Sequence, residues 1–189
     1  MTSIQRIASA LARRTYTREN LLIYAASEVP ATLQSSAVEV RCASRLLVQD
    51  LAWFHEPYEL QVFHEFLTAG HLGYLAYVDG RCVHRSWYVP GPARIHEHWS
   101  QELNIRTTDG FVHYCKTAQE ARGMGVFPAV LARIATDHPM SRTTMAIAKD
   151  NAASWRAANK AGWTPVEEVR YSVSLGVRRQ RRRPVTSDS

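Results

Sequence analysis

The chain has 189 residues, of which 46% are hydrophobic, and a formal net charge of +6 at pH 7. This is typical of one soluble globular domain, and it excludes a membrane-spanning helix because no run approaches the roughly 18 uninterrupted apolar residues that a span needs. The three cysteines, Cys42, Cys82 and Cys115, lack metal-ligand spacing and include an odd one, which favours the reducing cytoplasm over a disulfide framework.

The first half of the chain alternates between helical and extended patterns. Residues 1–18 are rich in Arg and Ser and contain no acid, as in an organelle transit peptide, but apolar residues at helical spacing favour an ordinary N-terminal helix. The next expected elements are strands at 21–26 and 38–43, a helix at 57–67, strands at 72–78 and 81–89 joined by a tight Asp79-Gly80 turn, and short strands at 94–99 and 102–105.

The second half is more regular, and its order indicates a mixed sheet with helices packed on it. Five arginines then crowd into residues 178–189, so we expect a single domain over 1–177 followed by a basic, disordered tail. The expected elements are a strand at 111–116, a glycine turn, a helix at 126–136, a strand at 143–148, a helix at 151–160 that stops at Gly162, and a strand at 166–175.

The most informative segment is 114–131, YCKTAQEARGMGVFPAVL, where a strand runs into a glycine turn that opens a helix. Glycines let the backbone approach a ligand closely, and the unpaired amides of a helix N-terminus suit a pyrophosphate. A dinucleotide fingerprint does not fit, because Pro128 stands where its third glycine belongs, and a P-loop would need Gly-Lys-Ser/Thr. The segment therefore predicts a different phosphate cradle.

The string Arg-Gly-Met-Gly-Val at 122–126 resembles the Arg/Gln-x-x-Gly-x-Gly/Ala coenzyme A loop of the GNAT superfamily, and NAASWRAANKAGW at 151–163 is similar to a second signature of that family. The resemblance implies an α/β (α+β) GNAT fold, with a mixed, mostly antiparallel central sheet and helices on both faces. Two positions depart from the pattern. Phe127 replaces the final Gly or Ala of the loop, and Ala158 stands where many members carry a tyrosine that protonates the leaving thiolate.

The resemblance also implies how acetyl-CoA would be held, in a split between the strand that ends at Thr117 and the strand at 143–148. An alternative loop register from Glu120 would set a carboxylate beside a dianion, so the register from Arg122 is favoured. Backbone groups of 115 and 117 would pair with the pantetheine arm, and either Lys160 or Arg156 would meet the adenosine phosphate. The implied cofactor-binding residues are Cys115, Thr117, Arg122, Gly123, Met124, Gly125, Val126, Phe127, Asn151, Ser154 and Lys160.

Transfer to an amine needs a neutral nucleophile, so a base should assist the reaction. Candidates are His113, Glu97 and His84; His113 is preferred because regular alternation would put it on the same face as Cys115. Cys115 itself is an alternative acyl acceptor, although direct transfer is the chemistry that the resemblance implies. His96 and His98 flank Glu97, but spacing reveals no third ligand, so no metal is expected.

The expected function is an acetyl-CoA-dependent N-acetyltransferase that acts on a primary amine of a small metabolite, such as an amino sugar. Two alternatives stay open: acetylation of a protein or tRNA amine, and a non-catalytic module that binds coenzyme A or nucleic acid. The Arg-rich tail suits a polyanion, although a small-molecule acceptor is favoured over nucleic acid. A homodimer is compatible with the sequence, and the expected location is the cytoplasm.

Overall fold

The computed structural model describes residues 16–26, 37–97, 101–139, 142–175 and 177–185. No helix in these ranges is long and apolar enough to cross a membrane. The strands are β1 (Tyr16–Ala26), β2 (Glu39–Cys42), β3 (Leu72–Val78), β4 (Arg81–Pro90), β5 (Ala93–Glu97), β6 (Gln101–Ile105), β7 (Asp109–Thr117), β8 (Arg142–Ala148), β9 (Trp163–Ser174) and β10 (Val177–Pro184). The helices are α2 (Pro57–Thr68), α3 (Val126–Asp137), α4 (Ala152–Lys160) and two short 3₁₀ helices, η2 (Leu47–Leu51) and η4 (Gln119–Ala121).

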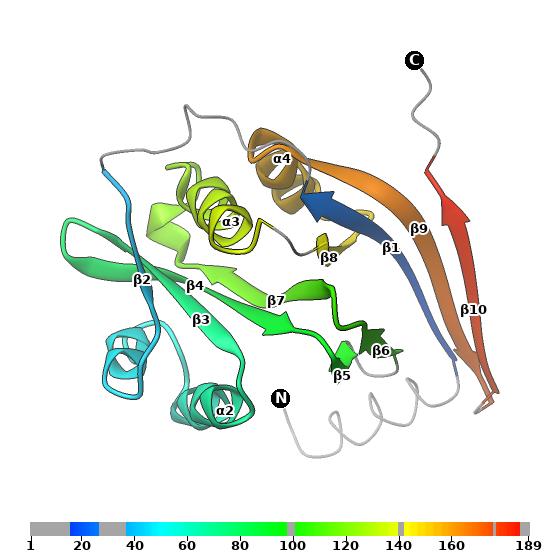
Figure 1. The fold of residues 1–189 in the computed structure, drawn as a ribbon, viewed down its shortest axis with the longest axis horizontal. Helices are drawn as coiled ribbons and strands as arrows, with labels where there is room; N and C mark the ends of the chain where they lie inside the picture. The colour runs from blue at the N-terminus through cyan, green and yellow to red at the C-terminus, as the bar shows by residue number, and fades with distance from the viewer. Residues whose placement is uncertain (1–15, 27–36, 98–100, 140–141, 176, 186–189) are drawn as a thin grey trace.

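Eight strands form one sheet in the order β10-β9-β1-β8-β7-β4-β3-β2, and β5 and β6 form a separate two-stranded ribbon. Only the β7–β8 pair of the large sheet is parallel. In Figure 1, α3 and α4 lie above the sheet and α2 lies below it. The expectation of a mixed, mostly antiparallel sheet with helices on both faces is confirmed.

Local sequence signals account for several element boundaries. Helix α2 begins with a capping box in which the Glu56 and Glu59 side chains each accept from the other residue's backbone amide, with Pro57 in the first turn. Asp79 and Gly80 have φ angles of 49° and 76°, the left-handed pair that a two-residue hairpin requires. These turn residues therefore fix the predicted β3–β4 hairpin.

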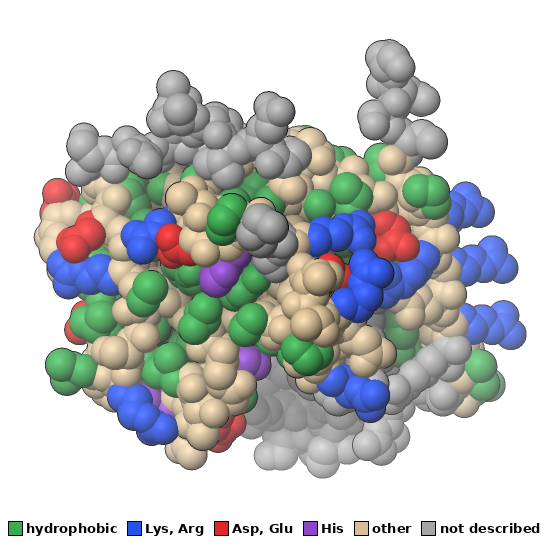
Figure 2. Space-filling view, viewed as in Figure 1, with side chains coloured by type: hydrophobic (Ala, Val, Ile, Leu, Met, Phe, Trp, Pro, Cys, Tyr) green, Lys and Arg blue, Asp and Glu red, His purple; other side chains and the backbone are tan. Residues whose placement is uncertain are grey.

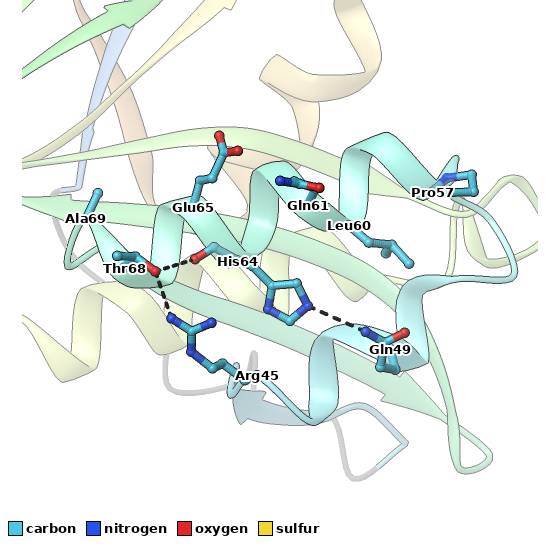
Figure 3. A pocket seen from close by; sticks show the side chains of 9 residues that line it. All are labelled: Arg45, Gln49, Pro57, Leu60, Gln61, His64, Glu65, Thr68 and Ala69. Atoms are coloured by element: carbon cyan, nitrogen blue, oxygen red, sulfur yellow. Dashed lines mark hydrogen bonds between the residues drawn. The ribbon is translucent and has the colours of Figure 1, made fainter.

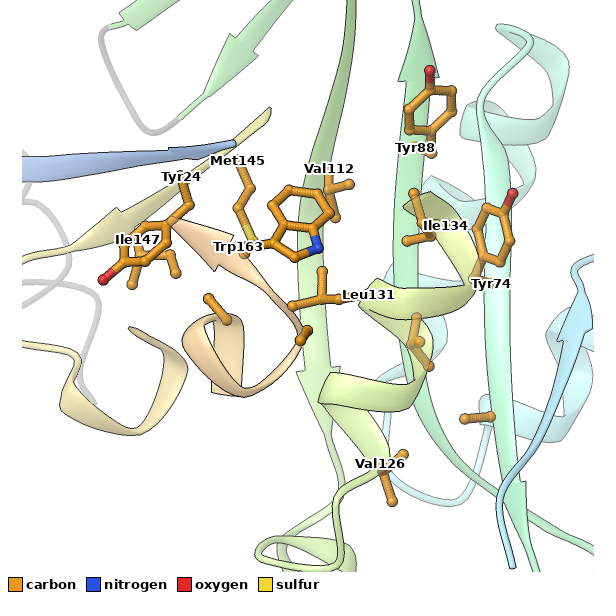
Figure 4. Close-up of a cluster of buried hydrophobic side chains, with 14 of the residues drawn as sticks. Tyr24, Tyr74, Tyr88, Val112, Val126, Leu131, Ile134, Met145, Ile147 and Trp163 are labelled. Carbon is orange, nitrogen blue, oxygen red and sulfur yellow. The ribbon is translucent and has the colours of Figure 1, made fainter. Parts of the chain in front are cut away.

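The main core lies between the sheet and the pair α3–α4, where Trp163, Leu131 and Met145 are buried (Figure 4). A second core lies between α2 and the sheet, where Phe63 packs against Trp87. Burying each such side chain contributes about 1.5–3 kcal/mol. The two cores together hold the sheet from both faces and fix the strands that form the site.

Both ends of the described chain differ from the sequence expectations. Residues 16–18 belong to β1, so an N-terminal helix does not extend to residue 18, and the rest of that expected helix lies outside the described residues. Residues 177–184 form β10, which pairs with β9 along its whole length, so a disordered tail beginning at 178 is wrong for this segment. Arginine is tolerated there because β10 is an edge strand whose described side chains are exposed.

Candidate active site

The sheet splits open between β7 and β8. Their parallel register runs from Asp109–Arg142 to Val112–Met145, and beyond it both strands continue without pairing to each other. A cleft of about 600 Å³ lies at this divergence and is lined by β7, the glycine turn, α3 and α4. Unpaired backbone of two diverging strands can accept an extended ligand as an additional strand.

The glycine turn leads into the N-terminus of α3. Gly123 and Gly125 have φ angles of 83° and 76°, and a Cβ built at either position would meet nothing within 4 Å. The turn therefore requires glycine for its left-handed backbone and not for space. No side chain caps α3 at Gly125, so the first amides of the helix, at Val126 and Phe127, have no capping acceptor from the protein.

This uncapped helix end is suited to an anion. The α3 dipole adds partial positive charge at its N-terminus, the first turn carries no acid, and Arg122 lines the same cleft. Met124 instead points outward, with 54% of its surface exposed. Ten of the eleven implied cofactor-binding residues line the cleft: Cys115, Thr117, Arg122, Gly123, Gly125, Val126, Phe127, Asn151, Ser154 and Lys160.

Helix α4 forms the opposite wall. The Asn151 side-chain oxygen accepts from the Ser154 amide at 3.1 Å, so it caps α4 and fixes its start. Arg156 and Lys160 also line the cleft from this helix. Both residues considered for the adenosine phosphate thus lie on one wall of the cleft.

A buried histidine of β4, His84, is one of the residues that line the cleft. His84 Nδ1 is 2.7 Å from the Thr117 hydroxyl, its Nε2 is 2.7 Å from the Ser86 hydroxyl, and its ring stacks on Phe127. Burial, aided by Arg85, lowers the pKa of His84 to about 3. The ring is therefore neutral at pH 7 and makes one donated and one accepted hydrogen bond, to the hydroxyls of Thr117 and Ser86, while stacking positions Phe127.

His113 does not accompany Cys115 in the cleft lining, because β7 does not alternate regularly. Tyr114 has a φ of 52°, and the β4–β7 register shifts by one residue there, which defines a β-bulge. The His113 ring lies 3.2 Å from His71 and against Phe66. Burial lowers its pKa to about 3, with smaller contributions from His71 and Arg85. Its position and pKa both argue against the preferred general base.

Glu97 lies in the β5–β6 ribbon, where it pairs with Gln101. This ribbon packs beside the ends of β4 and β7 and contributes no residue to the cleft lining. The side chains of Glu97 and of its neighbours His96 and His98 lie outside the described part of the structure. The roles considered for this triplet therefore stay predictions.

A polar cluster that sequence reasoning missed lies between α2 and β7. Glu59 Oε1 is 3.1 Å from His55 Nδ1 and 3.7 Å from Arg85 Nη2, and Glu59 Oε2 is 3.9 Å from Lys116 Nζ. Arg85 is buried, packs on Tyr114 at 4.4 Å, and has two guanidinium nitrogens without a partner. Burial lowers its pKa to about 10, so it is still charged at pH 7.

Lys116 connects this cluster to the cleft. Its ammonium donates to the Phe54 carbonyl at 3.2 Å, and the residue also lines the cleft. In sequence the members of the cluster are spread over residues 55–116, and only the fold brings them together. The one local signal, Glu59 three residues after the N-cap Glu56, has an ordinary capping explanation.

A second cavity, of about 750 Å³, lies between η2 and α2 (Figure 3). Its polar side chains bond to one another, as in the 2.9 Å bond from Arg45 to Thr68 and the 3.5 Å contact between Gln49 and His64. None of its lining residues comes from β7, α3 or α4. It is therefore separate from the cleft that carries the glycine turn.

No protein-family model and no curated protein matches the sequence, but solved structures match the fold. A GNAT-family acetyltransferase from Colwellia psychrerythraea aligns with 86% of this chain at 15% identity and a TM-score of 0.57. A GCN5-related N-acetyltransferase-like protein from Streptococcus suis aligns with 92% at 11% identity and a TM-score of 0.55. A GNAT-family protein from Novosphingobium aromaticivorans aligns with 82% at 15% identity and a TM-score of 0.57.

These matches show that the chain has the GNAT fold, as the resemblance of residues 122–126 and 151–163 predicted. The alignment covers 58%, 68% and 63% of the three proteins, respectively, so the chain spans only part of each. At these identities the likeness concerns the fold alone. The chemistry has to be argued from the cleft itself.

Proposed function

We propose that this chain transfers the acetyl group of acetyl-CoA to a primary amine of a small metabolite, such as an amino sugar. The observation that carries the proposal is the uncapped α3 N-terminus, which opens into the cleft between the diverging strands β7 and β8. A glycine turn with outward amides suits a pyrophosphate, and unpaired strand backbone suits an amide-bearing arm. Acetyl-CoA contains both groups.

The residues present fit such a ligand. The amides of Gly123, Gly125, Val126 and Phe127 would hold the pyrophosphate, and Cys115 and Thr117 would offer backbone groups to the pantetheine arm. The Arg122 side chain adds a cation to the same cleft. When bound, acetyl-CoA supplies an activated thioester; the protein's part is to orient its carbonyl carbon toward the attacking amine.

The acceptor amine has to lose its proton, and the structure suggests how the site favours that loss. Histidines 84 and 113 each have a pKa of about 3, so neither is tuned near neutrality as an efficient base would be. Lys116 lines the cleft, and its ammonium lies with charged Arg85 on the α2 side of β7, where the Glu59 carboxylate partly offsets both charges. Nearby cations lower the pKa of an amine, and a larger fraction of the acceptor is then neutral.

The leaving thiolate does not receive a proton from a tyrosine at position 158. Ala158 is fully buried in the main core, so the methyl group faces other apolar side chains. We therefore infer that solvent at the open cleft protonates the thiolate. Replacing Ala158 by tyrosine would overpack this core.

The test is release of free thiol from acetyl-CoA in the presence of a panel of amines: amino sugars, polyamines, amino acids and a lysine peptide. We expect turnover with at least one small amine and little with the peptide. A coenzyme titration on the same protein separates the two ways to fail. Tight coenzyme binding without turnover on any amine would contradict the transferase, and no coenzyme binding would contradict the site.

A further inference from the structure

The edge of the sheet at β10 carries a row of arginines. Arg179, Arg181 and Arg183 alternate along the strand, so they share one face, and all three are exposed. Figure 2 shows Lys and Arg side chains projecting along this edge and gathered beside it. What sequence alone presented as a basic tail is thus an ordered, one-sided row.

Further cations lie on the same face of the neighbouring strands β9 and β1. Arg181 lies opposite Arg170 on β9, and Arg179 lies opposite Ser172, which itself lies opposite Arg18 on β1. Lys149 reaches the same face, where its ammonium is 3.2 Å from Glu168. Six cations therefore form one basic array: Arg18, Lys149, Arg170, Arg179, Arg181 and Arg183.

The array is poorly neutralised. Glu168 alternates to this face and binds both Lys149 and Arg170 at 3.2 Å, and these hydrogen bonds lower its pKa. Glu167 alternates to the opposite face and pairs with Arg182. Arg179, Arg181 and Arg183 have no acidic partner among the residues that the structure describes. Among the residues that the structure describes, Glu168 is the carboxylate paired within the array, and Glu19 and Asp150 line a pocket beside Arg18 and Lys149 at one end of it, so the β10 end keeps its positive charge.

Protection of an exposed edge does not explain this arrangement. Charged residues on β10 itself would suffice to discourage pairing with another strand. Arg170 and Arg18 lie instead on β9 and β1, inside the sheet. In addition, Arg170 and Arg181 are directly opposed, and like charges in that position destabilise a sheet. A ligand of opposite charge would relieve this repulsion.

We propose that the basic array binds the phosphate backbone of a nucleic acid, independently of its sequence. Alternate residues of a strand are about 6.6–6.8 Å apart, so the three β10 arginines form a straight line suited to an elongated polyanion. The guanidinium fork matches phosphate geometry. Contacts from Arg and Lys to phosphates fix the position of a duplex without reading its bases.

The experiment measures binding of a fluorescent 20-base-pair DNA duplex to the full chain across a salt series. The variant combines Arg179→Gln, Arg181→Gln and Arg183→Gln. Each lost phosphate contact lowers the log–log salt slope by about 0.9, so we expect the slope to fall by about 2.7. Affinity at about 0.1 M salt should fall by about two orders of magnitude, while acetyl-CoA binding is unchanged.

Two matched variants control for net charge and folding. Arg45→Gln, Arg94→Gln and Arg106→Gln remove the same charge away from the array and should leave the slope within about 1 of the wild type. The triple variant Arg179→Lys, Arg181→Lys and Arg183→Lys should keep most of the wild-type salt slope. Equal losses in both glutamine triples, or no duplex binding by the wild type, would overturn the proposal. Binding to vesicles of anionic phospholipid in place of the duplex would overturn it in favour of a membrane surface.

Discussion

The two sides of the β7 strand are built in opposite ways. On the α3 side, the glycine turn is one contiguous segment, with left-handed backbone at Gly123 and Gly125 and an uncapped helix end. On the α2 side, charged and imidazole groups from separate elements are buried together around Glu59 and Arg85. The α3 side offers free backbone donors to a ligand, whereas the charged side chains on the α2 side pair with one another.

The difference shows how the two sides contribute to one reaction. Backbone amides at a helix end attract a polyanion without any ionisable group, so coenzyme binding on the α3 side should be insensitive to pH near neutrality. The α2 side has fixed charges and histidines with depressed pKa values. Its stability should therefore respond to charge removal and to acid, which the following variants probe.

The largest expected effect is on the α2 side. Glu59→Ala leaves Arg85 buried, with its Nη2 deprived of the carboxylate at 3.7 Å, and breaking a buried pair in this way costs about 3–5 kcal/mol. Urea unfolding measures the loss. The double variant Glu59→Ala with Arg85→Met should recover most of it, because no buried charge is then left alone. A double variant as unstable as the single one would show that the pair is not coupled.

A negative charge at the glycine turn should weaken coenzyme binding without any change in side-chain shape. Gly125→Asp places a carboxylate at the α3 N-terminus and should weaken acetyl-CoA binding by at least about 100-fold, or about 2.7 kcal/mol. Gly125→Asn is the matched control, since it has the same shape and also tolerates a left-handed backbone. Calorimetric titration compares the two. Equal weakening by both would assign the effect to backbone strain and not to the phosphate site.

The sequence predicted the α3 side of β7 better than the α2 side. The glycine turn and both flanking elements are local, and residues 122–127 apart from Met124 line the cleft, while their part in binding a cofactor stays a prediction. The bulge at Tyr114 was missed because one left-handed residue leaves no periodic signal, and it moved His113 away from the cleft lining. The pairing of Glu59 with Arg85 depends on a helix meeting a strand 20 or more residues away.

The strand order shows a similar limit. β1 was expected as a strand, but its place between β8 and β9 depends on which edge of the sheet is free after folding. Hydrophobic alternation does not encode that choice. β10 was missed because composition favoured a disordered tail, whereas pairing with β9 along eight residues orders it.

Acid should weaken the fold through the buried histidines. His84 and His113 have a folded pKa of about 3, below the unfolded value of about 6.5. The unfolded chain therefore binds more protons between these values, so stability falls as pH drops below 6.5 and levels off near 3. At pH 5 the loss is about 2 kcal/mol per ring.

His113→Phe should remove one ring's share of this loss, as measured by thermal unfolding at pH 7 and pH 5, with His64→Gln as the control. It should also leave the acetyl-transfer rate nearly unchanged. A loss of rate of about 100-fold or more, in a folded variant, would restore His113 as the general base.

The smallest effect concerns the α4 wall. Asn151→Ala removes the cap on the Ser154 amide and should cost about 1 kcal/mol, a fall in Tm of about 2–4 °C for a chain of this size. Asn151→Asp keeps the acceptor and should restore the Tm. If Asn151 also contacts the coenzyme, the coenzyme affinity should fall in both variants.

The central claim is that the amides around Gly123 to Phe127 hold a pyrophosphate, and amide chemical shifts test it directly. The measurement is a titration of ¹⁵N-labelled protein followed by amide chemical shifts, first with coenzyme A and then with pantetheine, which lacks the pyrophosphate. The account predicts large shifts at Gly123, Gly125, Val126 and Phe127 with coenzyme A and small ones with pantetheine. Unmoved amides in this turn at saturating coenzyme A would contradict it.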